Sequence, residues 1–251
     1  MTTKYIMKRT ACLLAFAALV CSCGEQSYRQ PAFGGMKGRV QEVTIHHIMP
    51  EGWREDDSGS GLMYTNASAY DIDGNEICSA LLDSTGHIQS QAESLFENGV
   101  CIRSTQKAGN RTIATLDLVS KDKNVLTYNK RVQGKPTVMK VTEKKRGRKY
   151  TSTVTEDGKV TTVSVITTDA QGQPISVSTT DAQGKEILET NTFKGGNIIE
   201  KHIKKVGTTL ESVIYTDYTQ FDAQGNWTEA RTYNKIHMAE EILRREIKYW
   251  P

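Results

Sequence analysis

The chain repeats itself near its centre, where it reads TTDAQGQPISVS at residues 167–178 and TTDAQGKEILET at residues 179–190. Each copy contains the polar tetrapeptide Asp-Ala-Gln-Gly, followed by residues that alternate in polarity. Glycine adopts positive φ without steric cost, and Asp or Asn tolerates it, so Asx and Gly together are typical of tight turns between strands. The unit therefore predicts a turn followed by a short strand, repeated along the chain.

Glycines carry the same rhythm over most of the chain. They recur about every twelve residues, with one beat missing between Gly109 and Gly134. Short strands at regular spacing with turn signals between them are typical of an all-β protein. Strands of roughly five to nine residues fit between the turns. The glycines of the series are Gly74, Gly86, Gly99, Gly109, Gly134, Gly147, Gly158, Gly172, Gly184, Gly196 and Gly207.

Alternating polarity supports strands rather than helices. Val163 and Val165 share one face of the segment 159–168, and Ile175 and Val177 share one face of the next. Valine and threonine suit a pleated, half-buried surface, and one apolar face opposite a wet one is typical of antiparallel sheets. The apolar face has to be covered. We therefore predict a long, twisted antiparallel meander that curls towards a half-barrel or folds into a loose sandwich.

The amino terminus has the features of an export signal. Basic residues precede an apolar run at 11–20, which is shorter than the roughly 20 residues that a membrane-spanning helix needs. Such a run fits the hydrophobic part of a signal peptide. We assign residues 1–22 to this signal, 23–35 to a tether, and 36–251 to one β domain.

The run ends in Val20-Cys21-Ser22-Cys23-Gly24, which resembles a bacterial lipobox with an uncommon residue, Cys21, at the position two before the cleavage site. The resemblance implies cleavage after Ser22 and lipid on Cys23, and several acyl chains on one cysteine give stable membrane anchoring. The alternative is an ordinary secretory signal with incidental cysteines. The leader holds three of the 32 basic residues and none of the 29 acidic ones, so its removal leaves the two kinds equal. Nucleic acid is therefore not an expected partner.

Two segments near the ends of the β domain carry a family resemblance. Tyr70-Asp71-Ile72-Asp73-Gly74-Asn75 and Phe221-Asp222-Ala223-Gln224-Gly225-Asn226-Trp227 resemble the Y-D-x-x-G-N core of the YD (Rhs-type) repeat. The chain is similar to small YD-repeat lipoproteins of the Bacteroidetes, and its rhythm resembles that of MORN repeats. The central copies depart from the pattern, because Thr-Asp stands where Tyr-Asp is expected. The resemblance implies an extracytoplasmic β-sheet protein.

The sequence offers little chemistry for a metal or a cofactor, and we expect neither. His46 and His47 are adjacent on a predicted strand, so they point to opposite faces and cannot easily share a metal. The acidic stretch at residues 71–76 lacks the spacing of an EF-hand, and a hairpin turn explains it. Cys78 and Cys101 are predicted to lie two strands apart, roughly 9.5 Å in a flat meander, against a disulfide Cβ separation of about 4 Å. We therefore expect them not to be joined, although an oxidising compartment would permit a disulfide.

Two groups of residues are candidates for ligand contact. A basic cluster stands at a predicted hairpin tip, where it could contact an anionic group or simply keep the turn soluble. Three tryptophans are candidates for glycan contact, with packing as the alternative. The cluster is Lys144, Lys145, Arg146, Arg148 and Lys149, and the tryptophans are Trp53, Trp227 and Trp250.

These patterns favour a non-enzymatic, membrane-anchored β-repeat lipoprotein with a binding or structural role. It would lie at the outer membrane or cell surface, or on the periplasmic face, with a glycan or an envelope protein as its partner. One alternative is a glycan-active enzyme, which would need two carboxylates roughly 5 to 9 Å apart. No catalytic residue is assigned, because the spacing of acidic residues offers no such pair. A second alternative is a subunit of an outer-membrane complex.

Overall fold

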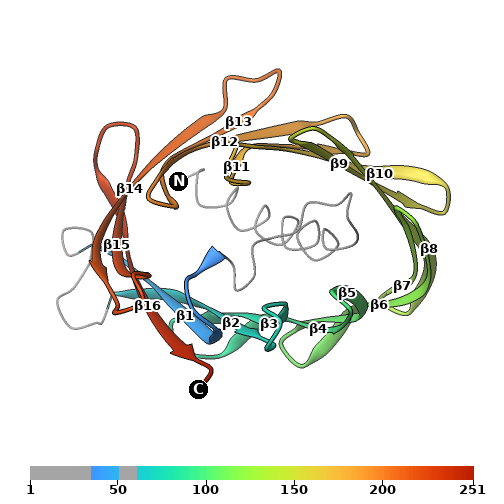
Figure 1. Cartoon of the computed structure of the whole chain (residues 1–251), viewed down its shortest axis with the longest axis horizontal. Coiled ribbons are helices and arrows are strands. Elements are labelled where there is room, and N and C mark those ends of the chain that lie inside the picture. Colours follow the sequence, from blue (N-terminus) through green and yellow to red (C-terminus); the bar gives the residue numbers. More distant parts are fainter. Residues whose placement is uncertain (1–34, 51–60) are drawn as a thin grey trace.

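The computed structural model describes residues 35–50 and 61–251. They form one antiparallel sheet whose strands follow chain order, and β1 pairs with β16, so the sheet closes into a barrel (Figure 1). Within these two ranges, no helix has the length and hydropathy to span a membrane. The strands are β1 (Val40–Ile48), β2 (Leu62–Tyr70), β3 (Glu76–Asp83), β4 (Ile88–Glu97), β5 (Val100–Ala108), β6 (Arg111–Asp122), β7 (Val125–Val132), β8 (Lys135–Arg146), β9 (Lys149–Glu156), β10 (Lys159–Thr168), β11 (Pro174–Asp181), β12 (Glu186–Lys194), β13 (Asn197–Lys205), β14 (Glu211–Phe221), β15 (Trp227–Tyr233) and β16 (Ala239–Tyr249).

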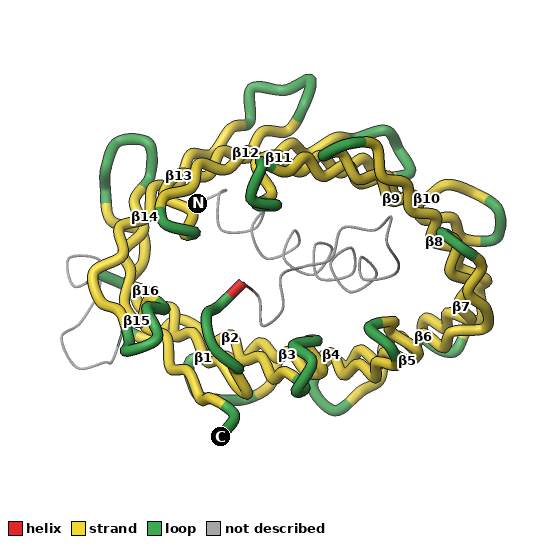
Figure 2. Tube along the Cα trace, viewed as in Figure 1, coloured by secondary structure: helices red, strands yellow, loops and turns green. Residues whose placement is uncertain are grey.

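Turns at the two openings of the barrel join consecutive strands (Figure 2). Their positions confirm the spacing of glycines. Every glycine of the predicted series has positive φ, for example 71° at Gly99 and 79° at Gly158. The missing beat is also a turn. There the chain passes from β6 to β7 with Lys123 at a φ of 44°, so a non-glycine residue adopts the left-handed conformation. The rhythm therefore marks strand ends even where glycine is absent.

An Asp or Asn side chain organises the five-residue turns. Asp71 Oδ1 accepts hydrogen bonds from the backbone N–H of Asp73 at 3.0 Å and of Asn75 at 2.8 Å. This is the local bonding for which Asx residues are favoured in turns. It explains the stretch at 71–76 as a hairpin turn, and the described part of the chain contains no group of three or more His, Cys, Asp or Glu that could hold a metal. The same bonding recurs at Asp83, Asp169, Asp181, Asp222 and Asn234.

Closure is the main correction to the predicted fold. The predicted all-β antiparallel meander is confirmed, but it neither stops at a half-barrel nor folds into a sandwich, because β1 and β16 pair from Val40↔Tyr249 to Ile48↔Ile242. A closed sheet leaves no edge of unpaired backbone groups, which is the physical reason that closure is favoured. The repeat could not reveal it, because the same local pattern serves an open or a closed meander.

Burial identifies the inner face of the barrel. A single closed sheet has no second layer outside it, so side chains with almost no exposure must lie on the concave side. Tyr128 and Met139 are each 1% exposed and lie opposite each other on β7 and β8. Paired residues share a face, and alternate residues change face, so the register carries this assignment around all sixteen strands.

The register corrects one expectation about the central repeat. Val163 and Val165 of β10 pair with Thr180 and Ser178 of β11, and these positions face outwards. Ile166 pairs with Val177 on the inner face. Val163 and Val165 of the first segment therefore point to the opposite side from Val177 of the second. Alternation shows which residues share a face of one strand but does not show which face is concave.

Candidate functional site: the inner face of the barrel

Apolar side chains from most strands face inwards, together with polar and charged ones such as Glu189 and Lys201. A barrel of about eight strands is filled by its own side chains, whereas one of about 16 strands encloses more space than they can fill. The inner face is therefore the natural place for a ligand in this chain. Its apolar members include Val43, Ile45, Leu81, Leu116, Leu118, Leu126, Met139, Val141, Val154, Ile166, Val177, Ile187, Ile203, Ile214, Leu243 and Ile247.

The outer face is charged around most of the circumference. Cross-strand ion pairs lie on it, with Arg103 Nε 2.6 Å from Asp117 Oδ1 and Lys107 Nζ 2.8 Å from Glu93 Oε1. Membrane barrels have the reverse arrangement, an apolar outer band about 25 Å tall around a polar interior. The charged part of the outer face is suited to water, whereas apolar side chains such as Val163, Val165 and Val138 face outwards elsewhere. The outward charges include Glu42, Lys140, Lys144, Glu200, Lys204, Asp217, Arg231, Arg244, Glu246 and Lys248.

The ring is oval, and β6 to β8 lie at one end of its long axis (Figure 1). An apolar core lies on these strands and on the neighbouring β5. The Tyr128 hydroxyl in this core donates to the Cys101 carbonyl at 3.1 Å. Beside the core, Lys130 Nζ lies 2.5 Å from Glu156 Oε1, so this inward charge has a partner. The core, which we term the apolar end, consists of Val100, Leu116, Leu126, Tyr128, Met139 and Val141.

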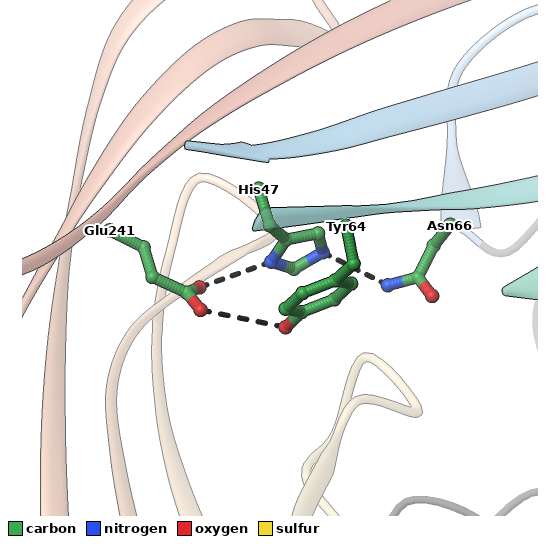
Figure 3. A network of polar contacts seen from close by, with 4 residues as sticks. All are labelled: His47, Tyr64, Asn66 and Glu241. Carbon is green, nitrogen blue, oxygen red and sulfur yellow. Dashed lines mark hydrogen bonds and ion pairs between the residues drawn. The ribbon is translucent and has the colours of Figure 1, made fainter. Parts of the chain in front are cut away.

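The other end of the long axis carries polar groups on β16, β1 and β2. His47 Nδ1 lies 3.1 Å from Glu241 Oε2, and the amide of Asn66 lies 2.9 Å from His47 Nε2 (Figure 3). The Tyr64 ring stacks on the imidazole with centroids 4.0 Å apart, and its hydroxyl donates to Glu241 Oε1 at 3.5 Å. Burial, together with the charge of Glu241, raises the pKa of Tyr64 well above its ordinary value.

Both ring nitrogens of His47 are therefore engaged. An imidazole with its proton on Nδ1 would satisfy both contacts, to Glu241 and to Asn66. These contacts link β1, β2 and β16 through the His47 ring.

Arg245 on β16 faces inwards and pairs with Ile45 of β1. It lies two residues after Leu243, the partner of His47. Its guanidinium carbon lies 3.9 Å from the centroid of the Trp227 ring, and its Nε donates to the Trp227 carbonyl at 2.7 Å. Burial lowers the pKa of Arg245 to about 10. Among the residues that the structure describes, no carboxylate lies within 4.0 Å of a nitrogen of Arg245, so the cation has no ion pair there.

Tyrosines surround this cation, and burial raises their pKa values. For Tyr70, burial and then the charge of Glu76 raise the pKa to about 12, and burial also raises the pKa of Tyr218. Glu76 accepts a hydrogen bond from Ser68 Oγ at 2.6 Å, and burial raises the pKa of its carboxyl. We term Arg245 with Trp227, Tyr70, Tyr218 and Tyr249 the arginine cluster.

Asn226 joins the two termini of the barrel and contacts Tyr249 of the arginine cluster. Its Oδ1 accepts from the backbone N–H of Lys37 at 2.7 Å, and its Nδ2 donates to the Lys37 carbonyl at 2.8 Å. The same Nδ2 lies 2.7 Å from the Tyr249 hydroxyl, which donates to Asp222. One side chain thus ties the entry to β1, the end of β16 and the turn before β15.

The basic hairpin tip is where the sequence placed it, between β8 and β9, and all five of its side chains are exposed. The register divides the cluster, because Lys144 and Arg146 face outwards whereas Lys145 lies on the inner-face side, 5.1 Å from the Tyr150 centroid. The structure therefore does not gather these residues into one site.

The tryptophan candidates are also not brought together. Trp227 contacts Arg245, whereas the half-buried Trp250 lies beyond β16 with its indole N–H buried and unbonded among the described residues. Trp53 and the lipidation candidate Cys23 lie outside the described residues. Of the two described tryptophans, Trp227 contributes to the inner-face site.

The histidine and cysteine predictions are confirmed. His47 faces inwards to Glu241, whereas His46 faces outwards with Nε2 3.6 Å from Glu246 Oε1. Cys78 on β3 and Cys101 on β5 are not joined by a disulfide.

Reasoning from the sequence missed Arg245, Glu241 and Tyr64. The alternation of residues 243–250 was a usable signal, because it places Arg245 on the same face as Leu243 and Ile247. A charge on the apolar face of a strand suggests a special role.

No family model matches the chain, and neither does any curated protein. Solved structures with a similar arrangement include a porin-like protein from Bacteroides vulgatus ATCC 8482, with 10% identity and a TM-score of 0.45 over 84% of this chain and 98% of that one. Another is a porin-like protein from Bacteroides uniformis ATCC 8492, with 11% identity and a TM-score of 0.48 over 84% and 99% of the two chains. Likeness at this level defines neither the ligand nor the location of this chain.

Proposed function

We propose that this protein is a non-enzymatic envelope lipoprotein whose barrel stands in water beside the membrane and binds an apolar or amphipathic molecule on its inner face. The carrying observation is that apolar side chains from most strands face inwards, beside ion pairs such as Lys201–Glu189, whereas cross-strand ion pairs lie on the outer face. Burying apolar area contributes roughly 25 cal/mol per Å², so an apolar lining favours a ligand with a hydrocarbon part.

Envelope location is supported by the sequence. An apolar run followed by Val20-Cys21-Ser22-Cys23 fits export and lipidation, and the charged outer face fits a domain that is tethered rather than embedded. A lysine or arginine at the bilayer midplane costs roughly 2–4 kcal/mol on the lipid face of a barrel. Several strands carry an outward lysine or arginine, for example Lys140 and Lys248. Anchoring through a lipid on Cys23 is therefore more favourable than embedding the barrel in the bilayer.

A neutral fluorescent probe tests the binding proposal. The full-length protein should bind N-phenyl-1-naphthylamine saturably, because the dye fluoresces in apolar surroundings. Ile166→Asp places a charge on the inner face and should abolish the signal. Val165→Asp is the matched control, one residue away and outward, and it should bind the dye like the wild type. Equal binding by both variants, or no binding by wild type, would overturn the proposal.

Fractionation tests the anchor separately. The wild-type protein should be found with the membranes and should incorporate radiolabelled palmitate. Cys23→Ala should lose the label, whereas Cys21→Ala should keep it. Label on Cys23→Ala would show that Cys23 is not the lipidated residue.

A further inference from the structure

The arginine cluster is a cationic site on the inner wall, and the inward-facing residues next to Arg245 on β16 and opposite it on β1 are apolar. Arg245 has Ile45 opposite it on β1, and Leu243 and Ile247 beside it on the inner side of β16. Charged groups are rarely left without an opposite charge in apolar surroundings, because removing a charge from water is costly. Here the described residues supply a π-face and one carbonyl to Arg245 but no ion-paired carboxylate.

The nearby carboxylates are already bonded elsewhere. Asp222 accepts from the Tyr249 hydroxyl and from the backbone N–H groups of Gln224 and Asn226. Glu76 accepts from Ser68 on β2. The guanidinium of Arg245 uses only Nε in a bond to the described residues. Its terminal nitrogens form the fork that matches a carboxylate or phosphate in bidentate geometry.

We propose that Arg245 binds the anionic headgroup of an amphiphile, whose hydrocarbon chain lies along the inner face. This proposal rests on the proposed function and specifies the ligand class. Ile45, Leu243 and Ile247 give the first part of the chain an apolar surface. The Trp227 ring holds the guanidinium plane in place, so less conformational entropy is lost when the anion binds.

Headgroup charge is the variable that tests this proposal. Binding of palmitate and hexadecanol to the full-length protein is measured by displacement of N-phenyl-1-naphthylamine, below the concentrations at which either aggregates. The two ligands share a chain length, so the wild-type preference for palmitate reports the headgroup. A charged hydrogen-bonded pair contributes roughly 1.5–3 kcal/mol, so we expect at least about a tenfold preference.

Arg245→Gln should lower palmitate affinity about tenfold and leave hexadecanol affinity unchanged. Arg245→Lys keeps the charge without the planar fork, so its palmitate affinity should lie between those of the wild type and of Arg245→Gln. Arg244→Gln is the matched control, because Arg244 is the adjacent residue and faces outwards to Glu229. It should bind both ligands like the wild type. A second pair, lysophosphatidylglycerol and lysophosphatidylcholine, distinguishes a phosphate-bearing lipid from a fatty acid as the preferred anion.

The outcomes separate the two proposals. If the dye and hexadecanol bind but palmitate is not preferred, or if the preference survives Arg245→Gln, the anionic site is wrong and the barrel still binds apolar ligands. If neither dye nor hexadecanol binds wild type, the proposed function fails as well. Should Arg245→Gln fail to fold, Arg245→Lys decides, because a folded lysine variant with an unchanged preference would contradict a bidentate site.

Discussion

The two ends of the oval barrel keep their inner walls together in different ways. At the apolar end, side chains such as Met139 and Val141 are almost fully buried against one another. At the opposite end, His47 and Asn226 make directional contacts to Glu241 and Lys37, between segments that are far apart in the chain. Packing closes the first end, and hydrogen bonds specify the second, where the two terminal strands must find each other.

This difference suggests that packing stabilises the apolar end, whereas hydrogen bonds determine the strand register at the opposite end. Apolar packing is tolerant of partner identity, whereas a hydrogen-bonded side chain specifies one register and one neighbour. The seam between β1 and β16 is the place where the meander could close out of register. Concentrating polar contacts there selects the correct closure, and it leaves charged groups on an inner wall where a ligand can meet them.

The largest expected effect is at the apolar end. Met139→Ala removes a side chain that is 1% exposed, so it loses both burial and packing and should destabilise the protein by about 3 kcal/mol. Val138→Ala is the control, because Val138 lies next to it on β8 and is 45% exposed. Urea unfolding followed by tryptophan fluorescence measures both. Equal losses in the two variants, or a larger loss for Val138→Ala, would contradict the assignment of Met139 to the buried inner face.

The seam should respond to loss of a single amide. Asn226→Ala leaves the N–H and carbonyl of Lys37 without this partner, and a cost of about 2 kcal/mol is expected. Asn75→Ala is the matched control, since Asn75 occupies the same position in a sister turn but its amide bonds only locally, to Asp71 at 2.8 Å. Urea unfolding should show the smaller loss for Asn75→Ala. A larger loss there would contradict the role of Asn226 in closure.

The smallest effect is expected at Glu76 and should depend on pH. Burial raises the pKa of this carboxyl, so between its unfolded and folded pKa values the folded state binds more protons than the unfolded one. Stability from this group therefore falls as pH rises through that window. Glu76→Gln keeps the bond from Ser68 and removes the titration, so its melting temperature should exceed that of the wild type at pH 8 and equal it at pH 4. An identical difference at both pH values would contradict this explanation.

The sequence was sufficient for the strands and turns because their causes are local. Asp71 and Gly74 form a turn through bonds that span at most four residues, and such patterns can be read directly. The Tyr70-Asp71 and Phe221-Asp222 segments also have a local explanation, since each Asp organises its turn after the strand ends.

Closure and the inner site could not be read in this way. The bonds from Asn226 to Lys37 and from His47 to Glu241 join residues 189 and 194 positions apart, and no local pattern records them. Which face is concave depends on the closed ring, so Val165 and Ile166 could not be assigned to outside and inside beforehand. The charged residue within the alternating segment 243–250 was visible, but its surroundings were not.

The pairing of β1 with β16 also has a kinetic consequence. The hydrogen bond from Lys248 to Glu42 spans 206 residues, so the first strand of the barrel can pair with the last only when almost the whole chain is present. Contacts of such long range are formed slowly, because loop entropy is lost before they stabilise the chain. A chain that crosses a membrane from its amino terminus would complete its barrel only after translocation ends. Until then β1 would present an open edge, which makes this stage the one at which aggregation or chaperone binding is expected.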